Sequence, residues 1–440
     1  MIKATAHSPQ LLTSEQAVAL VNPTDTIGMG LGPANPDGFL QALATRDDWE
    51  DLVVGGALLL NYYEVFTKPG VSFRSGFYGP AERLLASQGN RVEHVPGGFR
   101  QFAPILERFR PRVMIVQGSL EEDEGRINLS LHYGGTRPEL LRAGDDPERV
   151  LIVEVNPRLP RTRSLPPEFD NTLPLETVDV LVEGTSEIID LPETVPDGVD
   201  RAIASNALQY VKQGSTLQIG IGAVPDLVAN ELCVGSRGDF GLHSEMFTTG
   251  MMKLHKAGKV SNKRKGVFVG KSVTTFALGT RELYGWLDSN DDVAFIDVGT
   301  LNDPHVIGRN GNFLSINGAL TIDLYGQIVA DNIGGRQISG VGGQEDFVAG
   351  AELRLDARSL ICMRSTVEVS GQRRSRIVGR LPEGSVVSTP RHHTGVIITE
   401  YGSAELAGLT VRERARALAG IAHPDFRGDL AKIADALGRA

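Results

Sequence analysis

Residues 216–228 read TLQIGIGAVPDLV and carry the clearest fold signal in the chain. Its apolar start predicts a buried strand that ends at Ile219, and Pro225 suits the first turn of a following helix. A strand, a glycine turn and a helix in this order form the βα unit of a parallel sheet. Backbone N–H groups in the turn can hold a phosphate, a carbonyl oxygen or an oxyanion, and the alternative is a tight turn without a ligand. Pro225 replaces the third glycine of a dinucleotide-binding fingerprint, so the stretch does not match that motif.

A similar pattern occurs earlier in the chain, at a constant offset of 190 residues. Each copy is expected to contain a helix, a strand, a Gly-x-Gly turn and a second helix that opens at Pro-Asp. The matched positions are Ala17, Val21, Thr26, Gly30 and Gly32 in the first copy and Ala207, Val211, Thr216, Gly220 and Gly222 in the second. Chance matches of small residues are the alternative to two homologous α/β halves.

Short β-branched runs alternate with amphipathic stretches, which predicts a mainly parallel sheet with helices on both faces. Residues 191–198, LPETVPDG, contain two prolines and a glycine and break any regular element. We predict two similar open α/β domains, 1–195 and 196–440, with the active site in the cleft between them. The expected strands include 113–116, 150–155, 216–219, 267–269 and 293–298, and the expected helices include 14–21, 200–212 and 225–232.

The composition is that of an average globular protein, with 440 residues, 41% of them hydrophobic and 22% charged. The net charge of -10 argues against nucleic-acid binding and against a polybasic membrane anchor. The two cysteines exclude a disulfide framework or a cysteine-rich zinc module. The longest apolar run, 52–60, contains two glycines and is far short of the ~20 residues that cross a bilayer. With no apolar signal sequence at the N-terminus, we expect a soluble, cytoplasmic protein without membrane partners.

Residues 241–252, GLHSEMFTTGMM, place Glu245 among methionine and phenylalanine side chains. A carboxylate in this company is either solvated at a loop or held in a partly dry pocket. In the second case it can act as a general base or as a nucleophile that forms a covalent acyl intermediate.

The segment 339–347, SGVGGQEDF, has three glycines within its first five residues. It can supply backbone donors to an oxyanion, or it is a flexible turn before an expected helix over 346–355.

Other motifs in the chain have weaker functional interpretations. Residues 266–272 imitate a phosphate-binding loop but are one residue short between the glycines. The adjacent His392 and His393 would point apart on a strand and lack a third ligand at metal spacing, so no metal site is expected. The absence of a Gly-x-Ser-x-Gly motif argues against a serine hydrolase. The basic run 262–265 is interpreted as a solvated loop, or else as a contact for ligand phosphates.

Together these segments resemble the acetyl-CoA hydrolase/transferase family, that is, class I CoA-transferases of the 4-hydroxybutyrate and butyryl-CoA:acetate type. The resemblance covers most of the chain and is strongest from about residue 200 to residue 430. The segments that carry it are LQIGIGAVPDLV (217–228), GLHSEMFTTGMMKLHKAG (241–258), LNDPHVIGRN (301–310), SINGALTIDLYGQ (315–327), SGVGGQEDFVAGA (339–351), RIVGRLPEGSVVST (376–389), ITEYGSAELAGLTVRERARAL (398–418) and IAHPDF (421–426).

The resemblance implies roles for individual residues and a set of partners. Glu245 would be the nucleophile, and Asn302 and Gly343 would line the oxyanion hole. No tightly bound cofactor and no metal are implied; the partners are an acyl-CoA, a small carboxylic acid and a second copy of the chain in a homodimer. Contacts to CoA or the acyl group are implied for Gly220, Ile221, Gly222, Ala223, Val224, Leu320 and Gly343.

The implied chemistry moves CoA between a short-chain acyl-CoA and a carboxylate through a glutamyl-CoA thioester on Glu245. The bonds exchanged are of nearly equal energy, so charge stabilisation and exclusion of water are what the protein must supply. An acyl-CoA hydrolase that uses the same Glu245 is the first alternative. A CoA-binding protein without turnover is the second.

Two departures from the family pattern affect substrate binding. Glu368 stands where the family often has a lysine near CoA, so Arg364 or Arg373 would have to substitute or the CoA pose would differ. The loop 119–125 lacks the prolines that the family carries on the side of the carboxylate acceptor, which leaves the identity of the acceptor open.

Overall fold

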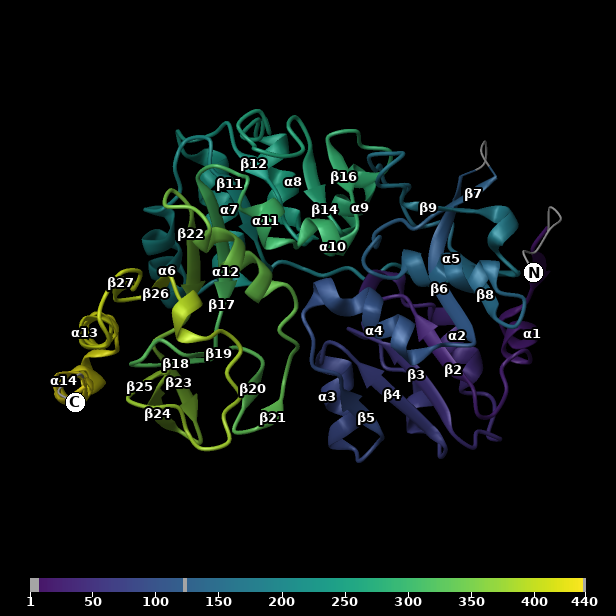
Figure 1. Ribbon diagram of the computed structural model, residues 1–440, viewed down its shortest axis with the longest axis horizontal. Helices are drawn as coiled ribbons and strands as arrows, with labels where there is room; N and C mark the ends of the chain where they lie inside the picture. Colours follow the sequence, from purple (N-terminus) through teal and green to yellow (C-terminus); the bar gives the residue numbers. More distant parts are fainter. Residues whose placement is uncertain (1–7, 122–124, 438–440) are drawn as a thin grey trace. The chain divides into compact units, whose positions relative to one another are not determined.

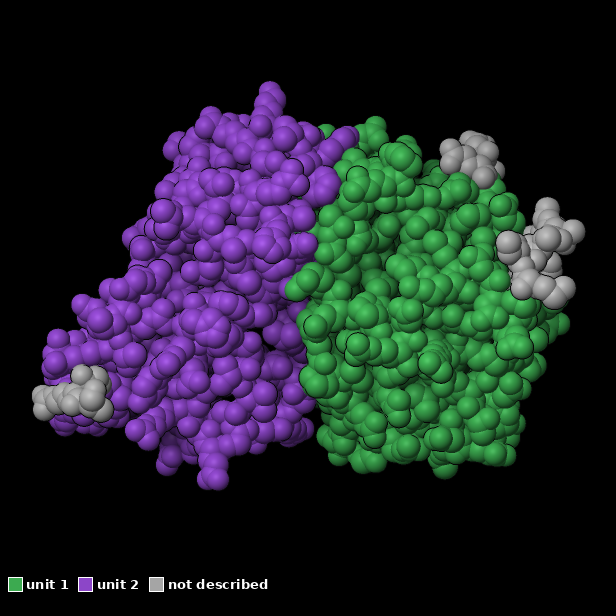
Figure 2. Space-filling model, viewed as in Figure 1, with its two compact units in different colours: residues 1–191, 273–301 green, residues 192–272, 302–440 purple. Residues whose placement is uncertain are grey.

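The computed structural model describes residues 8–121 and 125–437, and it is mainly parallel α/β, as predicted (Figure 1). The chain divides into two compact units, coloured separately in Figure 2. Unit 1 comprises residues 1–191 and 273–301, and unit 2 comprises residues 192–272 and 302–440. The segment 273–301 thus packs with unit 1 although it follows the first part of unit 2 in sequence. The domain limits expected from the sequence, 1–195 and 196–440, stay a prediction.

Unit 1 is built on a parallel sheet with the strand order β1-β10-β8-β6-β2-β3-β4-β5. Strand order reverses between β2 and β6, as in doubly wound folds. The parallel strands are β1 (Gln10–Leu12), β2 (Thr26–Met29), β3 (Leu52–Gly56), β4 (Val71–Ser75), β5 (Val92–His94), β6 (Val113–Glu121), β8 (Val150–Val155) and β10 (Val180–Glu183). The helices are α1 (Ser14–Val18), α2 (Asp37–Leu43), α3 (Pro80–Ser87), α4 (Phe102–Phe109), α5 (Arg137–Asp145), α9 (Arg281–Leu287) and α10 (Val298–Leu301).

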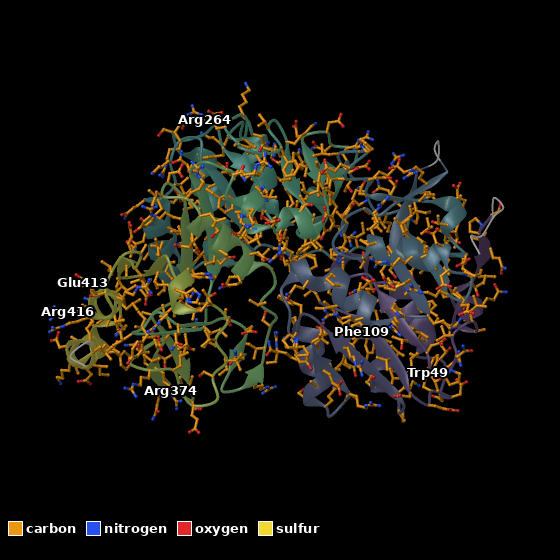
Figure 3. The ribbon with its side chains drawn as sticks, in the orientation of Figure 1. Trp49, Phe109, Arg264, Arg374, Glu413 and Arg416 are labelled. Atoms are coloured by element: carbon orange, nitrogen blue, oxygen red, sulfur yellow. The ribbon has the colours of Figure 1, made fainter. Side chains whose placement is uncertain are left out.

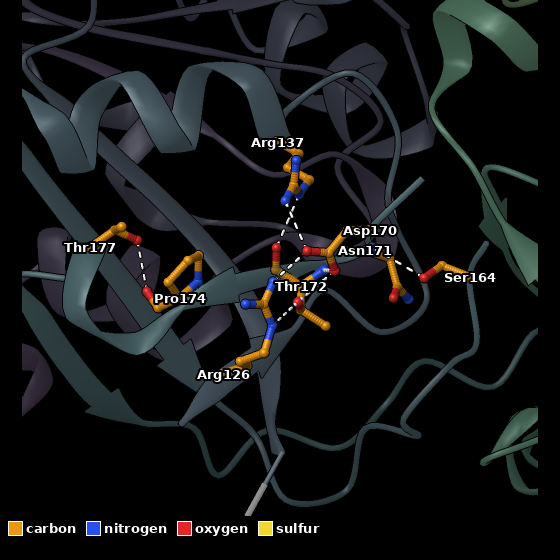
Figure 4. Close-up of polar contacts among 8 residues, drawn as sticks. All are labelled: Arg126, Arg137, Ser164, Asp170, Asn171, Thr172, Pro174 and Thr177. Carbon is orange, nitrogen blue, oxygen red and sulfur yellow. Dashed lines mark hydrogen bonds and ion pairs between the residues drawn. The ribbon is translucent and has the colours of Figure 1, made fainter. Parts of the chain in front are cut away.

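Two short strands extend this sheet in antiparallel orientation: β7 (Arg126–Asn128) pairs with β6, and β9 (Thr172–Pro174) pairs with β7. The Asp170 carboxylate makes ion pairs beside these strands (Figure 4). Asp170 binds the guanidinium groups of Arg126 and Arg137, and Arg137 Nε also donates to the Thr172 carbonyl at 3.0 Å. Since Arg137 is the first residue of α5, these contacts join the extension to the start of that helix.

Unit 2 contains a second sheet with the order β12-β11-β17-β22-β26-β27. All neighbouring pairs are parallel except β26 with β27. The strands are β12 (Gly241–Leu242), β11 (Thr216–Ile219), β17 (Phe313–Gly318), β22 (Arg358–Cys362), β26 (Val396–Thr399) and β27 (Gly402–Glu405). The helices are α6 (Gly198–Leu208), α7 (Ala223–Val234), α8 (Thr249–Lys256), α11 (Pro304–Ile307), α12 (Gln344–Glu352), α13 (Val411–Gly420) and α14 (Pro424–Ala436).

Smaller β elements follow the main sheet of unit 2. A three-stranded sheet has β18 in its centre, and two hairpins are formed by β20 with β21 and by β23 with β24. The helices α13 and α14 contribute residues such as Leu418 and Leu430 to a core that also includes Ile397 of β26. The bounds are β18 (Thr321–Asp323), β19 (Ile328–Val329), β25 (Ile377–Val378), β20 (Asn332–Ile333), β21 (Arg336–Gln337), β23 (Thr366–Val369) and β24 (Gln372–Ser375).

The structure confirms several sequence-based elements and corrects others. Strands β8 and β11 have the predicted limits, and the matched residues Thr26 and Thr216 both begin a strand. The expected strand 267–269 is wrong, because this stretch consists of bends and turns. The expected strand 293–298 is shorter, since β16 (Val293–Phe295) ends before α10 begins. Helix α7 begins at Ala223, before the Pro-Asp pair, and α12 begins at Gln344 rather than at residue 346.

No helix within residues 8–121 and 125–437 has the length and apolar character needed to cross a membrane.

Candidate functional site

Three of the predicted site residues meet in unit 2. Glu245 lies in the turn between β12 and β13 (Met246–Phe247), and its side chain is half-buried. Its Oε2 accepts a hydrogen bond of 2.6 Å from Nδ2 of Asn302. Gly343 touches both groups, since a Cβ built on it would lie 1.9 Å from Glu245 Oε2 and 2.3 Å from Asn302 Nδ2. The Glu245 carboxylate thus contacts the Asn302 amide, and both lie against the backbone of Gly343. A residue with a Cβ at position 343 would clash with both groups.

Topology explains how Glu245 comes to this place. In a parallel sheet the carboxyl ends of the strands share one edge, and loops at that edge carry ligands. Strand β12 runs parallel to β11, which runs parallel to β17. Glu245 after β12, the Gly220–Val224 turn after β11 and Leu320 after β17 consequently belong to the same edge of the sheet.

Asn302 is completely buried. It follows α10 directly and precedes Asp303, whose side chain caps α11 by accepting from His305 N at 2.8 Å. The oxygen of its amide group, Oδ1, is buried and has no hydrogen-bond partner among the residues that the structure describes. A buried amide of this kind costs free energy, and its orientation toward Glu245 is therefore maintained by the surrounding fold rather than by solvent.

Gly343 is the N-cap residue of α12, and Gly342 before it has a φ of 57°. The glycines of this segment thus have two separate reasons to be glycine. Gly342 adopts left-handed backbone geometry that residues with a Cβ rarely adopt, and Gly343 leaves space for the Glu245 carboxylate. The segment is the start of a helix rather than a free turn, so its backbone donors have defined directions.

Burial raises the pKa of Glu245 to about 7. The hydrogen bond from Asn302 opposes this shift, and the negative charge of Asp346 in the first turn of α12 adds to it. Burial dominates because a carboxylate that leaves water loses more hydration than one amide restores. At neutral pH the carboxyl is close to half ionised, which suits a group that alternates between carboxylate and acyl derivative.

The turn at Gly220–Val224 leads into the N-terminus of α7, a helix of 12 residues. Gly222 has a φ of 116°, a conformation that favours glycine, and the Ile221 side chain is 50% exposed. Unpaired N–H groups of a first helical turn point toward an anion or a carbonyl oxygen. An exposed isoleucine beside them offers an apolar contact. The ligand contacts of this turn stay predictions.

Leu320 lies between β17 and β18 and is half-buried. Its N–H donates to the Val329 carbonyl at 2.9 Å, so this donor is already used within the protein. A contact between CoA and the backbone at this position, which the resemblance implies, stays a prediction.

The arginines considered as substitutes for the family lysine are both paired with acids. Arg364 binds Asp197 at 2.9 Å and Asp200 at 2.8 Å. Arg373 contacts Asp425 at 3.3 Å and Glu368 at 3.5 Å, and Glu368 faces Arg373 across the β23–β24 hairpin. The charge of Glu368 is therefore partly compensated within its own hairpin.

Outside the site, the structure differs from two sequence-based interpretations, those of the histidine pair and of the basic run. His392 and His393 lie in a short 3-10 helix with ring centroids 4.5 Å apart, so the expectation that they point apart on a strand is wrong. The basic run 262–265 is not a solvated loop throughout, because Asn262 and Lys265 are 3% and 4% exposed. Of the loop 119–125, residues 122–124 lie outside the described residues.

Comparisons with known proteins place the chain among CoA enzymes. The family model described as acetyl-CoA hydrolase/transferase C-terminal domain matches residues 279–434. A 4-hydroxybutyrate coenzyme A transferase from Clostridium kluyveri is 34% identical over 432 residues, which cover 96% of this chain and 97% of that protein. The chain belongs to the acetyl-CoA hydrolase/transferase family.

Further relatives agree with this family membership. A butyryl-CoA:acetate CoA-transferase from Anaerostipes caccae is 33% identical, with 98% of this chain and 96% of that protein covered. The crystal structure of RipA from Yersinia pestis superposes with a TM-score of 0.86 at 31% identity and covers 97% of both chains. More distant family members include a protein named acetyl-CoA hydrolase from Eremothecium gossypii, 27% identical over 73% of this chain and 65% of that protein.

Sequence reasoning missed two features of the site. The sequence around Asp346 predicts only the start of a helix, yet the charge of Asp346 acts on Glu245. The basic run 262–265 predicts an exposed loop, yet Lys265 is buried. No local pattern marks either residue, because both properties arise from segments that are distant in sequence.

Proposed function

We propose that this chain is a CoA-transferase that moves CoA between a short-chain acyl-CoA and a carboxylate, with Glu245 as the nucleophile. The observation that carries the proposal is the contact of Glu245 Oε2 with the Asn302 amide and with the backbone at Gly343. Acyl transfer through a covalent intermediate needs a nucleophile with hydrogen-bond donors beside it. Here a side-chain amide and the N-terminus of α12 adjoin the Glu245 carboxylate.

In the first half-reaction a Glu245 carboxylate oxygen attacks the thioester carbonyl carbon of the acyl-CoA. The C–S bond breaks and CoA leaves as its thiolate, which gives a mixed anhydride between the acyl group and Glu245. The thiolate then attacks the Glu245 carbonyl carbon, and the original carboxylate leaves. A glutamyl-CoA thioester remains on the enzyme. Every step exchanges one acyl acceptor for another, so no oxidant, metal or nucleotide is consumed.

In the second half-reaction a different carboxylate attacks the glutamyl-CoA carbonyl, and the same steps run in reverse. The new acid leaves as its CoA thioester, and Glu245 returns to the carboxylate form. Nδ2 of Asn302, already 2.6 Å from Oε2, is placed to stabilise the oxyanion that develops on Glu245 itself. The backbone at Gly343 supplies the second donor in this proposal.

The state of Glu245 before reaction suits this role. Its pKa of about 7 keeps a large carboxylate fraction at neutral pH. The same burial that raises the pKa removes hydration from the oxygen, which raises its reactivity toward a carbonyl carbon. The turn Gly220–Val224 is proposed to contact the acyl-CoA, with Ile221 against an apolar part of the ligand.

A hydrolase that uses the same Glu245 is the first competing function, and it differs only in how well the loaded site excludes water. The relatives of highest identity reported above are named transferases, whereas the protein named a hydrolase is more distant, and this favours transfer. Product analysis with and without an added carboxylate separates the two: transfer yields a new acyl-CoA, and hydrolysis yields free CoA.

Intact-protein mass spectrometry after mixing with acetyl-CoA tests the proposal directly. We expect an adduct of the mass of CoA, and peptide mapping after borohydride reduction of the thioester should place it within 241–252. A series of acyl-CoAs that bind without forming any adduct would contradict covalent transfer and support a binding protein without turnover, or rapid hydrolysis if free CoA accumulates.

Three further properties belong to this proposal. We propose a homodimer, tested by light scattering after size-exclusion chromatography, and a cytoplasmic location, tested by cell fractionation. We also propose that no cofactor is tightly bound, which native mass spectrometry of the purified protein tests.

A further inference from the structure

Lys265 stands apart from the basic residues around it in the sequence. Its side chain is buried within unit 2, whereas Lys263 and Arg264 are exposed. Figure 3 shows Arg264 at the outer margin of the molecule. A buried lysine is rare because its ammonium group loses strong hydration, so its presence calls for a specific function inside the fold.

The amine of Lys265 donates two hydrogen bonds to backbone carbonyls. Nζ lies 2.8 Å from the Leu242 oxygen and 2.7 Å from the Lys271 oxygen. Both acceptors are neutral, and a neutral amine carries two N–H donors, so the two carbonyls match the neutral form. Burial also lowers the pKa of Lys265 well below its usual value. The geometry of Lys265 is therefore that of a hydrogen-bond donor to two backbone carbonyls.

Leu242 is the last residue of β12, a strand of two residues at the edge of its sheet. On one side β12 pairs with β11. On the other side two side chains take the place of a neighbouring strand: Oδ1 of Asn262 accepts from the Leu242 N–H at 2.9 Å, and Lys265 donates to the Leu242 carbonyl. The polar backbone groups of Leu242 on this side are thus satisfied by side chains.

The methylene groups of Lys265 add a packing contact to these hydrogen bonds. A Cβ built on Gly241 would lie 2.5 Å from Lys265 Cγ, so the lysine stem lies directly against the β12 backbone. Asn262 is itself held in place, because its Nδ2 donates to Ser272 Oγ at 3.0 Å. On the outer edge of the sheet, Gly241 therefore packs against the Lys265 stem, and Leu242 is hydrogen-bonded to Asn262 and Lys265.

Glu245 lies three residues after Leu242 in the chain. We propose that Lys265 is a positioning residue for Glu245: through the Leu242 carbonyl it fixes the end of β12 and so holds the Glu245 carboxylate against Asn302 and Gly343. This inference rests on the proposed function of Glu245 as nucleophile. On the outer side of β12 backbone pairing ends at the bridge between Phe240 and Val260, before Leu242. A reacting group has to be held within about 0.5 Å of its productive position, and the side-chain contacts to Leu242 extend the support of the backbone toward Glu245.

The test compares Lys265→Met with Lys263→Met, which removes an exposed lysine two residues away. Rapid quenching and mass spectrometry give the rate of glutamyl-CoA formation from acetyl-CoA, and calorimetry gives the affinity for CoA. We expect Lys265→Met to form the adduct at least about tenfold more slowly with an affinity for CoA changed less than about threefold. Lys263→Met should match the wild type in both. Adduct formation at the wild-type rate in Lys265→Met would overturn the proposal.

A loss of activity through general destabilisation has a separate control. Leu418 is a buried residue of α13 in a core cluster that contains no residue of β12, and Leu418→Ala should lower stability without touching β12. If Leu418→Ala, assayed well below its melting temperature, slows adduct formation as much as Lys265→Met, positioning is disproved. If Lys265→Met does not fold, Asn262→Ala replaces it, because it frees the other polar group of Leu242. A wild-type rate in Asn262→Ala then overturns the proposal.

Failure of this inference is distinguishable from failure of the proposed function. A wild-type protein without any adduct on Glu245 would refute the nucleophile. A wild-type adduct together with an equal rate in Lys265→Met would refute only the positioning role.

Discussion

Two carboxylates, the buried Glu154 in unit 1 and the half-buried Glu245 in unit 2, have a similarly raised pKa but different surroundings. Burial raises the pKa of each to about 7. Glu154 lies within β8 and accepts two backbone hydrogen bonds from the first turn of α2, 3.1 Å from Gly38 N and 2.9 Å from Phe39 N. Glu245 lies beyond the end of its strand and binds the side chain of Asn302. A perturbed pKa therefore does not by itself indicate a catalytic residue.

The difference lies in what the carboxylate is bound to. The partners of Glu154 are backbone groups of the fold, and the contact joins a strand to a helix. The partners of Glu245 are a buried amide and a glycine at a helix start, which are the groups that stabilise an oxyanion. A third carboxylate, Glu82, resembles Glu154: its pKa is raised to about 7, and it accepts from Leu59 N at 2.7 Å and Gly79 N at 2.9 Å.

The loss of transfer activity in Glu245→Ala is the largest effect that we expect, whereas Glu154→Ala should stay active. Glu245→Ala should lower the rate of CoA transfer by about 10⁴-fold or more, because the covalent route is lost. Its affinity for CoA should change little, as calorimetry would show. Transfer assays on Glu154→Ala provide the comparison. Near-normal turnover in Glu245→Ala would place the nucleophile elsewhere.

Asn302→Ala should reduce kcat by about a hundredfold, because one oxyanion donor is worth roughly 3 kcal/mol. The KM for acyl-CoA should change much less, since the donor acts mainly on charge that develops during reaction. Steady-state kinetics separate the two constants. An effect confined to KM would assign Asn302 to substrate binding and weaken the contrast between Glu245 and Glu154.

The pH profile sharpens the comparison further. Glu245 must be ionised to attack, so kcat/KM should fall up to tenfold for each pH unit below about 7 and become constant above it. The raised pKa therefore makes activity decline on acidification at a higher pH than an ordinary glutamate would. A profile measured with acetyl-CoA from pH 5 to pH 9 tests this. A constant rate down to pH 5 would mean that the nucleophile keeps an ordinary pKa.

The smallest effect on activity is expected for Glu154→Ala, which should transfer CoA within about twofold of the wild type at 25 °C. Its free energy of unfolding should fall by about 1–3 kcal/mol, because two buried N–H groups lose their acceptor. Chemical denaturation measures this difference. A large loss of kcat without loss of stability would contradict the structural role.

The same variant has a pH signature with a defined sign. The folded protein holds the Glu154 proton up to about pH 7, whereas the unfolded chain releases it near pH 4.5. The proton-linked part of the contribution of Glu154 to stability is consequently fully present below about pH 4.5 and lost as the pH rises toward 7, while the packing and hydrogen bonds of the side chain remain. In Glu154→Ala this part of the pH dependence should be absent.

The sequence predicted the alternating βα elements better than it predicted individual contacts. Alternating β-branched runs and Gly-x-Gly turns are local signals, and β8 and β11 have the predicted limits. The strand predicted over 267–269 is wrong because apolar and β-branched residues also occur in turns, where tertiary contacts decide the backbone conformation. The predicted start of α7 at Pro225 is wrong because the helix begins at Ala223, two residues before the proline.

The linear pattern of residues is enough to indicate the class of the fold and the candidate groups, namely the glycine turn at Gly220–Val224, the carboxylate of Glu245 and the ordered motifs of one enzyme family. Which of these groups meet depends on the folded chain. Asn302 and Gly343 lie 57 and 98 residues beyond Glu245 in the chain, yet both touch its carboxylate. The burial of Lys265 and the charge of Asp346 near Glu245 likewise depend on packing between distant segments, because solvation and electrostatics act through space rather than along the chain.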